Sequence, residues 1–368
     1  MEKPNELYYA IALTLVPQIG NVLARELLAH FETAENIFHI PQKALSAIPG
    51  IGVVRAREIK QFSKFERVEE ELKFIENHKI KVLFYQGKEY PKRLKNCYDS
   101  PMILYYAGNA DLNTSRILSV VGTRHYTEYG KDICENIMEG LSKENVLIIS
   151  GLAYGIDIIA HKKALKEGLK TVGVVAHGLD RIYPPLHAGI ARQMVKQGGL
   201  LTEYVSNTLP DKQNFPMRNR IVAGIADATL VIETGIRGGS LITAELANGY
   251  NRDVFAVPGK AGDKKSEGCN YLIRKNKAAL VTSAGDIMEM MGWEEHLKDN
   301  KPIQKELFVE LNEKEKDIVD LLTGVKMLHV DEIHLQSKLS SSETAATILS
   351  LELQGFIKSM PGKMYKLV

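Results

Sequence analysis

Between residues 117 and 257, short runs of β-branched residues alternate with amphipathic stretches, and this alternation constrains the fold more than any other feature. The predicted strands are 117–121, 146–150, 171–176, 199–203, 229–233 and 253–257. The predicted helices are 130–143, 155–167, 186–196, 217–225 and 240–251. Strand–helix–strand units of this length indicate an α/β fold, with a parallel doubly wound sheet and right-handed connections.

The composition is that of a soluble globular protein with more than one domain. The chain has 368 residues, of which 45% are hydrophobic and 25% charged, and its formal net charge is only +2. Charge alone therefore neither requires nor excludes a nucleic-acid partner. The cysteines Cys97, Cys134 and Cys269 are scattered, which argues against a zinc ribbon or a disulfide framework and fits a reducing cytoplasm. No signal peptide and no membrane span are expected.

The first 80 residues predict a small helical domain with an internal repeat. The segment VPQIGNVLAR at 16–25 is echoed by IPGIGVVRAR at 48–57, and each predicts a glycine turn followed by an amphipathic helix. The second resembles a helix-hairpin-helix element, whose glycine N–H groups and helix start favour a DNA phosphate. A purely structural helical hairpin fits equally well. Residues 62–78 predict a polar helical linker.

The C-terminal part, residues 303–368, predicts a winged-helix domain behind a polar linker at 294–302. The predicted helices are 313–322, 330–338 and 342–354, and the predicted strands are 355–358 and 363–368. Winged-helix domains often read DNA through their third helix. Here that helix carries no Lys or Arg, so a protein contact is favoured over a major-groove contact.

The functional residues are expected in the middle domain, residues 81–302, because parallel sheets bind ligands beyond the carboxyl ends of their strands. After the strand at 229–233, glycines leave backbone N–H groups unobstructed at a helix start, and hydroxyl donors follow them. This pattern predicts an anion site suited to a phosphate. Its residues are Gly238, Gly239, Ser240 and Thr243, with Gly235 and Arg237 beside them.

Three further strand exits supply basic and flexible groups. The first contains Gly122 and Arg124, the second Gly151, and the third Lys212, Phe215, Arg218, Asn219 and Arg220. Cations around an aromatic ring suit single-stranded nucleic acid, because the charges pair with phosphates and the ring stacks on a base. The bland alternatives are that the two arginines of the third exit pair with Asp227 or Glu233, and that Phe215 belongs to the core.

Enzyme chemistry is not expected. The chain lacks the patterns GxxxxGK[ST], HExxH, GxSxG and CxxC, and it lacks GxGxxG followed by an acidic residue. No cofactor, no metal site and no catalytic residue is therefore predicted. Asp157, Glu233 and Glu245 are interpreted as caps or loop anchors, and His161 and His177 as structural histidines.

Five stretches of the middle domain resemble the signature segments of the DprA/Smf family, in the family's order. They are VGTRHYTEYG, SGLAYGIDIIAHKKAL, FPMRNRIVAGIADATLVIE, GGSLITAELANGYNRDVFAVPG and VPGKAGDKKSEGCNYLIRKNKAAL. The resemblance implies an extended Rossmann-like fold in a protein that binds single-stranded DNA. It also implies protection of incoming DNA, loading of the RecA recombinase in natural transformation, and a homodimer formed through this domain.

The resemblance also assigns individual residues. It implies DNA contacts at Arg124, Lys212, Phe215, Arg218 and Arg220, with a phosphate pocket at Gly239, Ser240 and Thr243. Met217 stands where relatives often carry a basic residue. The alternative function is a nucleotide-processing enzyme, since GIRGGS at 235–240 and Glu245 resemble elements of the nucleoside-monophosphate phosphoribohydrolases. Those enzymes carry a PGGxGT loop, whereas no proline precedes GIRGGS here.

Overall fold

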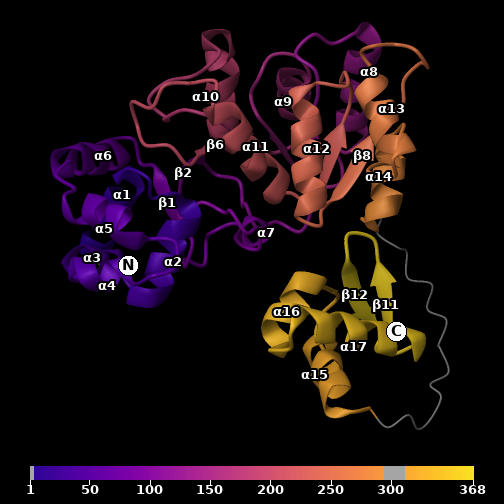
Figure 1. Ribbon diagram of the computed structural model, residues 1–368. Helices are drawn as coiled ribbons and strands as arrows, with labels where there is room; N and C mark the ends of the chain where they lie inside the picture. The colour runs from indigo at the N-terminus through magenta and orange to yellow at the C-terminus, as the bar shows by residue number, and fades with distance from the viewer. Residues whose placement is uncertain (1–3, 294–310) are drawn as a thin grey trace. The chain divides into compact units, whose positions relative to one another are not determined.

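The computed structural model describes residues 4–293 and 311–368, and the chain forms two compact units (Figure 1). The first unit ends at Thr282 and contains the helical region and a large sheet. The second runs from Ser283 to Val368. The predicted linker at 294–302 lies outside the described residues, and the predicted domain boundaries at 80/81 and 302/303 stay predictions.

The helical region contains the predicted repeat. Its helices are α1 (Pro4–Leu15), α2 (Asn21–Phe31), α3 (Ala34–His39), α4 (Gln42–Ser46), α5 (Gly52–Lys60) and α6 (Phe65–Asn77). The turns before α2 and α5 both use a left-handed residue, Gln18 with φ 63° and Gly50 with φ 81°. Behind each turn an isoleucine, Ile19 or Ile51, is buried. The two segments therefore share a left-handed residue, a buried isoleucine and a following helix, although the turns differ at the next glycine, where Gly20 has φ −82° and Gly52 has φ 60°.

Three arginines of this region have their partners within the protein. Arg25 donates a hydrogen bond of 2.8 Å to Ser100 Oγ, and Arg55 donates one of 3.3 Å to the carbonyl of Gln18. Arg67 forms an ion pair of 2.8 Å with Glu71. These contacts favour the structural interpretation of the repeat over phosphate binding, because the arginines already hold the hairpins and the neighbouring loop in place.

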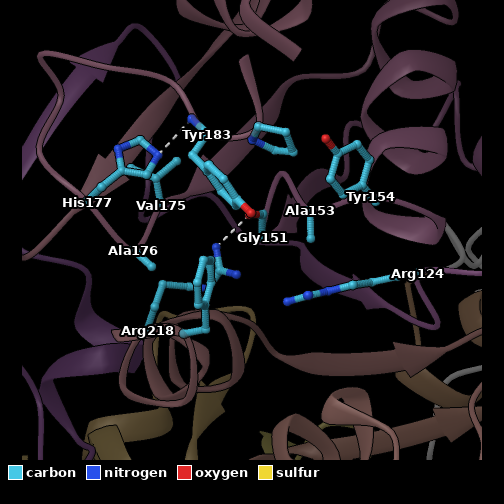
Figure 2. Close-up of a pocket in the computed structure, with 11 residues that line it drawn as sticks. Arg124, Gly151, Ala153, Tyr154, Val175, Ala176, His177, Tyr183 and Arg218 are labelled. Atoms are coloured by element: carbon cyan, nitrogen blue, oxygen red, sulfur yellow. Dashed lines mark hydrogen bonds between the residues drawn. The ribbon is translucent and has the colours of Figure 1, made fainter. Parts of the chain in front are cut away.

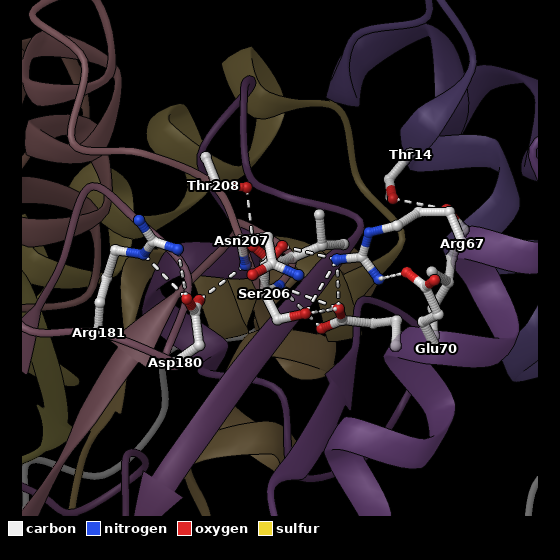
Figure 3. A network of polar contacts seen from close by, with 11 residues as sticks. Thr14, Arg67, Glu70, Asp180, Arg181, Ser206, Asn207 and Thr208 are labelled. Atoms are coloured by element: carbon white, nitrogen blue, oxygen red, sulfur yellow. Dashed lines mark hydrogen bonds and ion pairs between the residues drawn. The ribbon is translucent and has the colours of Figure 1, made fainter.

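Helix α6 corrects the prediction of a polar linker at 62–78. Val68, Glu71 and Ile75 of this helix are buried, and the helical region shares one apolar cluster with the first two strands of the sheet. Figure 3 shows the polar part of this junction, where Arg67 and Ser206 meet. The backbone N–H of Ser206 donates to the Glu71 carboxylate at 3.0 Å. Because the apolar face of α6 packs on the sheet side, the helix is a structural element of the first unit.

The first unit is built on a nine-stranded sheet. Its strands are β1 (Lys81–Phe84), β2 (Ile103–Gly108), β3 (Ile117–Val121), β4 (Leu147–Ser150), β5 (Thr171–Val174), β6 (Gly198–Thr202), β7 (Ala228–Val231), β8 (Asp253–Ala256) and β9 (Ala279–Leu280). Their order is β1-β2-β6-β5-β4-β3-β7-β8-β9. The pairs β1–β2 and β2–β6 are antiparallel and the others are parallel. The direction of winding reverses between β3 and β7, which is where doubly wound sheets bind ligands.

All six predicted strands are present; β3 has the predicted bounds, and the bounds of the other five differ from the predictions by at most two residues. The sequence prediction missed β1, β2 and β9, which extend the sheet at its two ends. The connecting helices are α8 (Glu128–Gly140), α9 (Ile156–Lys166), α10 (Ala188–Gln197), α11 (Asn214–Gly224) and α12 (Gly239–Gly249). Short helices α7 (Lys92–Lys95) and α13 (Glu267–Arg274) complete the unit. Right-handed connections place α8, α9 and α10 on one face and α11 and α12 on the other.

The second unit contains the predicted winged helix. After α14 (Ala284–Met291) come α15 (Glu313–Leu322), α16 (Val330–Ser337) and α17 (Ser341–Leu353). A three-stranded sheet follows the order β10-β12-β11, with β10 at Leu328–His329, β11 at Ile357–Met360 and β12 at Met364–Leu367. Ser340 and Glu343 form a capping box at the start of the third helix. The α/β fold class with a leading helical region and a winged-helix end is therefore confirmed.

Candidate nucleic-acid interface

A pocket opens at the carboxyl edge of the sheet, where the loops after β3, β4 and β5 meet helix α11 (Figure 2). We call it the arginine–aromatic pocket. Its cavity volume is about 60 Å³, which is below the range of small-molecule sites, so a ligand would lie partly in the open space above it. The lining residues are Arg124, Gly151, Ala153, Tyr154, Val175, Ala176, His177, Tyr183, Pro184, Phe215 and Arg218.

Two guanidinium groups converge on this pocket from different elements (Figure 2). Arg124 is exposed in the loop after β3, and its guanidinium carbon lies 5.7 Å from the ring centroid of Phe215. Arg218 is 4% exposed on α11. Phe215 and Arg218 are three residues apart on that helix, so both face the same side. The pocket thus combines one solvent-facing cation with one buried cation beside an aromatic ring.

The buried cation is held by backbone oxygens. Arg218 Nη1 donates to the carbonyl of Gly151 at 2.6 Å and also to the carbonyl of Val174, while Nε donates to Asn219 Oδ1 at 3.2 Å. Burial lowers the pKa of Arg218 to about 10, and the carboxylate of Asp157 opposes this shift. The guanidinium therefore keeps its charge at neutral pH, with the carboxyl of Asp157 close to it.

Asp157 acts as a loop anchor, as its sequence context suggested. Its Oδ2 accepts hydrogen bonds from the N–H groups of Gly151 at 3.1 Å and Ala153 at 3.4 Å. Burial raises the pKa of this carboxyl, while Arg218 and the two N–H donors act in the opposite direction. Because the Gly151 N–H is occupied by Asp157, this glycine serves the shape of the loop. A Cβ at Gly151 would lie 2.6 Å from the Arg218 guanidinium.

The loop after β3 is fixed by two close contacts. Glu233 is buried and accepts hydrogen bonds from the N–H and Oγ1 of Thr127, both at 2.9 Å. Gly155 has φ 83°, and a Cβ there would lie 2.0 Å from the carbonyl oxygen of Thr123. A Cβ at Gly122 would lie 2.5 Å from Ile156. These loops therefore need glycine for mutual packing, and Arg124 projects from a well-anchored segment.

Two tyrosines that line the pocket were absent from the sequence prediction, and His177, interpreted there as a structural histidine, also lines it. Tyr154 and Tyr183 are 44% and 43% exposed at the pocket, and the Tyr183 ring centroid lies 5.9 Å from that of Phe215. His177 Nδ1 donates to the carbonyl of Gly178 at 2.8 Å, and Nε2 accepts from the N–H of Tyr183 at 3.2 Å. Burial lowers the pKa of His177, so the ring is neutral near pH 7. The exposed tyrosine after β4, within SGLAYG, was the available sequence signal.

The pocket wall is connected to the helical region by the network of Figure 3. Two hydrogen bonds join the loop after β5, which lines the pocket, to the loop before α11. The N–H of Asn207 donates to Asp180 Oδ1 at 2.8 Å, and the N–H of Gly178 donates to the carbonyl of Thr208 at 3.2 Å. Ser206 of the same loop is bonded to Glu71 on α6. Helix α6 therefore supports two of the segments that form the pocket.

The remaining predicted residues lie elsewhere. Lys212 is exposed before α11 and is not among the lining residues. Arg220 is 4% exposed and forms an ion pair with Glu203, and its Nη1 donates to the carbonyl of Asp99. This guanidinium has its partners within the protein and supports the fold. The alternative that Arg220 pairs with Asp227 or Glu233 is also wrong, because its partner is Glu203.

The predicted phosphate site lies at the start of α12, across the β3/β7 switch from the pocket. A Cβ on Gly239 would meet no atom within 4 Å, so this backbone is open. Gly238 precedes the helix without a side-chain cap. Ser240 and Thr243 are both buried, and Ser240 Oγ has no hydrogen-bond partner among the described residues. The N–H of Gly238, predicted to be available, donates to the carbonyl of Gly235 at 2.9 Å. The hydroxyl of Ser240 remains available, and the site is separate from the arginine–aromatic pocket.

Neither a metal cluster nor a membrane span is found in the described part of the chain. No group of three or more His, Cys, Asp or Glu side chains there is arranged to hold a metal ion. None of the helices within 4–293 and 311–368 has the length and apolar character needed to cross a bilayer. Glu245, the residue of interest in the enzyme alternative, pairs with Lys277 at 2.7 Å on the exposed surface of α12.

Fold and site together define a class of doubly wound α/β proteins whose sheet edge carries a pocket lined by arginines and aromatic rings. In the sequence, a helix-hairpin-helix region precedes the sheet and a winged helix follows it. Residues 81–292 match the family described as DNA recombination-mediator protein A. Residues 309–363 match the DprA winged helix domain, and 10–72 match the helix-hairpin-helix motif. The chain belongs to the DNA recombination-mediator protein A family, the family known as DprA or Smf.

Individual relatives agree with this assignment. Protein Smf of Synechocystis sp. is 34% identical over 299 residues, which cover 78% of this chain and 73% of the relative. The X-ray structure of DNA processing protein A from Streptococcus pneumoniae has a TM-score of 0.68 at 33% identity, covering 77% of this chain and 96% of the other. A structure of DNA processing protein A from Helicobacter pylori, described for its single-stranded DNA binding mode, has a TM-score of 0.52 at 29% identity. It covers 57% of this chain and 94% of the other.

Proposed function

We propose that this protein binds single-stranded DNA through the arginine–aromatic pocket, protects incoming DNA and loads the RecA recombinase onto it in natural transformation. The observation that carries the proposal is the convergence of Arg124 and Arg218 on a space walled by Phe215, Tyr154 and Tyr183. Cations supply contacts for phosphate or base oxygens, and aromatic rings supply stacking surfaces. The similarity to a Helicobacter pylori protein described for its single-stranded DNA binding mode supports the same ligand.

The pocket favours an unpaired strand over a duplex. In a duplex each base is covered by its neighbours on both faces, so its ring is not available to Phe215 or Tyr183. A base of a single strand turns out without this unstacking cost. The guanidinium of Arg218 is held at the base of the pocket by backbone carbonyls, while the exposed Arg124 at the rim is placed to meet a phosphate.

Binding without catalysis fits the pocket better than the enzyme alternative. Among the described residues that line it there is no carboxylate, thiol or hydroxyl nucleophile other than the two tyrosines. The one histidine, His177, has both ring nitrogens engaged. Glu245 is held by Lys277 on an exposed face of α12. Turnover of a nucleoside monophosphate that is abolished by Glu245→Gln would contradict this part of the proposal.

The assembly and location of the protein belong to the same proposal. We expect a homodimer formed through the Rossmann-like domain, in the cytoplasm. RecA is the expected protein partner, measured as faster RecA filament formation on protein-coated single strands than on free ones.

The pocket assignment is tested by the salt dependence of DNA binding. The logarithm of the binding constant for single strands falls with the logarithm of the salt concentration, with a slope of about −0.7 per neutralised phosphate. Arg124→Ala is expected to weaken binding and to reduce the slope by about this amount for the one charge lost. The matched control is Arg192→Ala, which removes an exposed arginine from the middle of α10. Equal behaviour of the two variants would exclude Arg124 from the DNA contact.

A further inference from the structure

The segment 258–266 after β8 is fastened to two neighbouring loops at the carboxyl edge of the sheet. Lys265 Nζ donates a hydrogen bond to the carbonyl of His125 in the loop after β3. A Cβ on Gly235, in the loop after β7, would lie 3.2 Å from the carbonyl oxygen of Lys264. The loops after β3, β7 and β8 therefore form one continuous surface on the side of the switch point away from β4 and β5.

This surface carries an excess of positive charge. Arg237, Lys260 and Lys264 are exposed on it, and within the ranges that the structure describes none of the three forms an ion pair. Arg124 lies at the end of the surface nearest the arginine–aromatic pocket. The acidic Asp263 in the same segment directs Oδ1 to its own backbone, where it accepts the N–H of Lys265 at 2.9 Å.

The segment is ordered before any ligand arrives. Asp263 N–H donates to the carbonyl of Lys260 at 3.1 Å, and Ser266 N–H donates to the carbonyl of Asp263 at 3.1 Å. The side-chain amide of Asn270 accepts the N–H of Gly259 at 3.2 Å and donates to its carbonyl at 3.0 Å. A loop held in this way loses little conformational freedom on binding, so its lysines contribute more of their interaction to affinity.

Aromatic rings stand beside these cations. Tyr126 in the loop after β3 and Tyr129 in the first turn of α8 are 43% and 48% exposed. Tyr129 Oη donates to the carbonyl of Pro258 at 2.7 Å, which places that ring against the basic segment. Exposed rings next to unpaired cations are the combination that binds a single strand without sequence preference.

We infer that Arg237, Lys260 and Lys264 form a second DNA-binding segment, which takes the phosphate backbone of the strand after it leaves the arginine–aromatic pocket. The inference rests on the proposed function and extends its site across the switch point. In the strand order, β5 and β8 are four neighbours apart, a distance of about 19 Å at the usual spacing of strands. Only a strand several nucleotides long reaches both the pocket and the basic segment.

The test uses the full chain and two DNA probes. The variant Arg237→Ala/Lys260→Ala/Lys264→Ala removes the proposed segment. The control Lys143→Ala/Lys166→Ala/Lys170→Ala removes the same charge from exposed lysines near the amino ends of β4 and β5. Binding is measured by fluorescence anisotropy over a salt series. The probes are a thymidine dinucleotide, which is too short to reach both the pocket and the basic segment, and a thymidine oligomer of about 16 nucleotides.

For the longer oligomer, the first variant is expected to flatten the log–log salt slope by about 2, since three phosphate contacts at about 0.7 each are lost. The single variant Lys264→Gln is expected to flatten the slope by about 0.7, one third of that amount. All variants are expected to bind the dinucleotide with the same affinity as the wild type. If the wild type binds both probes and the two triple variants behave alike, the second segment is refuted and the pocket stands. If the wild type shows no salt-dependent binding to either probe, the proposed function fails, and the second segment with it.

Discussion

Replacing Arg220 tests whether this arginine serves the fold or the DNA. It sits on α11 two residues after Arg218 and was predicted to contact DNA. In the structure its Nη2 pairs with Glu203 and its Nη1 bonds the carbonyl of Asp99, and the side chains of the ion pair are only 4% and 8% exposed. We therefore expect Arg220→Met to change stability and to leave DNA binding by the folded protein intact.

The expected magnitude follows from the burial of the pair. Removing one partner of a buried ion pair typically costs about 3–5 kcal/mol, because the other charge is left without compensation. Burial already raises the pKa of Glu203, and Arg220 is the main influence against this. Without the arginine, that pKa rises further above its unfolded value. Between the unfolded and the folded pKa of Glu203, the folded state binds a proton that the unfolded state lacks. The loss of stability therefore grows as pH rises from the lower of these two values to the higher.

Urea unfolding and DNA titration together decide the question. A loss of about 3 kcal/mol, with an m-value of about 3 kcal/mol per M, moves the urea midpoint down by about 1 M. The double variant Arg220→Met/Glu203→Gln is expected to recover part of the loss, because it removes the isolated carboxylate. The reasoning is refuted if Arg220→Met changes stability by less than about 1 kcal/mol and lowers the salt slope by about 0.7.

Three further predictions concern stacking, the junction with α6 and a buried histidine. Phe215→Ala should weaken binding of single strands by about 1–3 kcal/mol with an unchanged salt slope, because a stacking ring and no charge is lost, whereas Phe215→Tyr should bind as the wild type in the same titration. Glu71→Gln should cost about 2 kcal/mol by weakening the hydrogen bonds from Ser206, seen in calorimetry as a melting point roughly 4–8 °C lower; an unchanged melting point would show that the α6 junction does not support the unit. Burial lowers the pKa of His161 to about 3, so the unfolded chain takes up its proton first and stability should fall as pH drops from about 6.5 toward 3. His161→Leu should flatten this fall by up to one proton in denaturant titrations across that range, and an equal pH slope in both proteins would contradict the assignment.

The alternation of strands and helices was predictable because it depends on local periodicity. Each strand from β3 to β8 is a short apolar run between helical stretches, and such patterns need no knowledge of distant residues. The strands β1 and β2 were missed because β2 joins the sheet by antiparallel pairing with β6 and β1 is added next to β2. The β2–β6 pairing depends on residues far away in the sequence. Helix α6 has a polar outer face, and only its packing on the sheet side shows that Val68 and Ile75 are core residues.

For the site, the residue types were predictable and their positions were not. The third strand exit was correctly identified as basic and aromatic, and Arg124, Phe215 and Arg218 do meet at one pocket. Arg218 and Arg220 look equivalent in the sequence, yet two residues on a helix differ by about 200° in direction. One therefore faces the pocket and the other faces Glu203. Helical phase was the signal that separates them.

The sequence by itself determined that the chain is an α/β protein with a helical start and a winged-helix end, because hydrophobic periods and glycine turns are local properties. It also determined which strand ends carry cations and rings. Only the tertiary structure decided which of those cations remain available. Whether an arginine meets solvent, a carbonyl or a carboxylate depends on loops brought together by the sheet order. That order places Arg124 at a pocket, Arg220 against Glu203 and the exposed Lys260 and Lys264 beside the loop of Arg237.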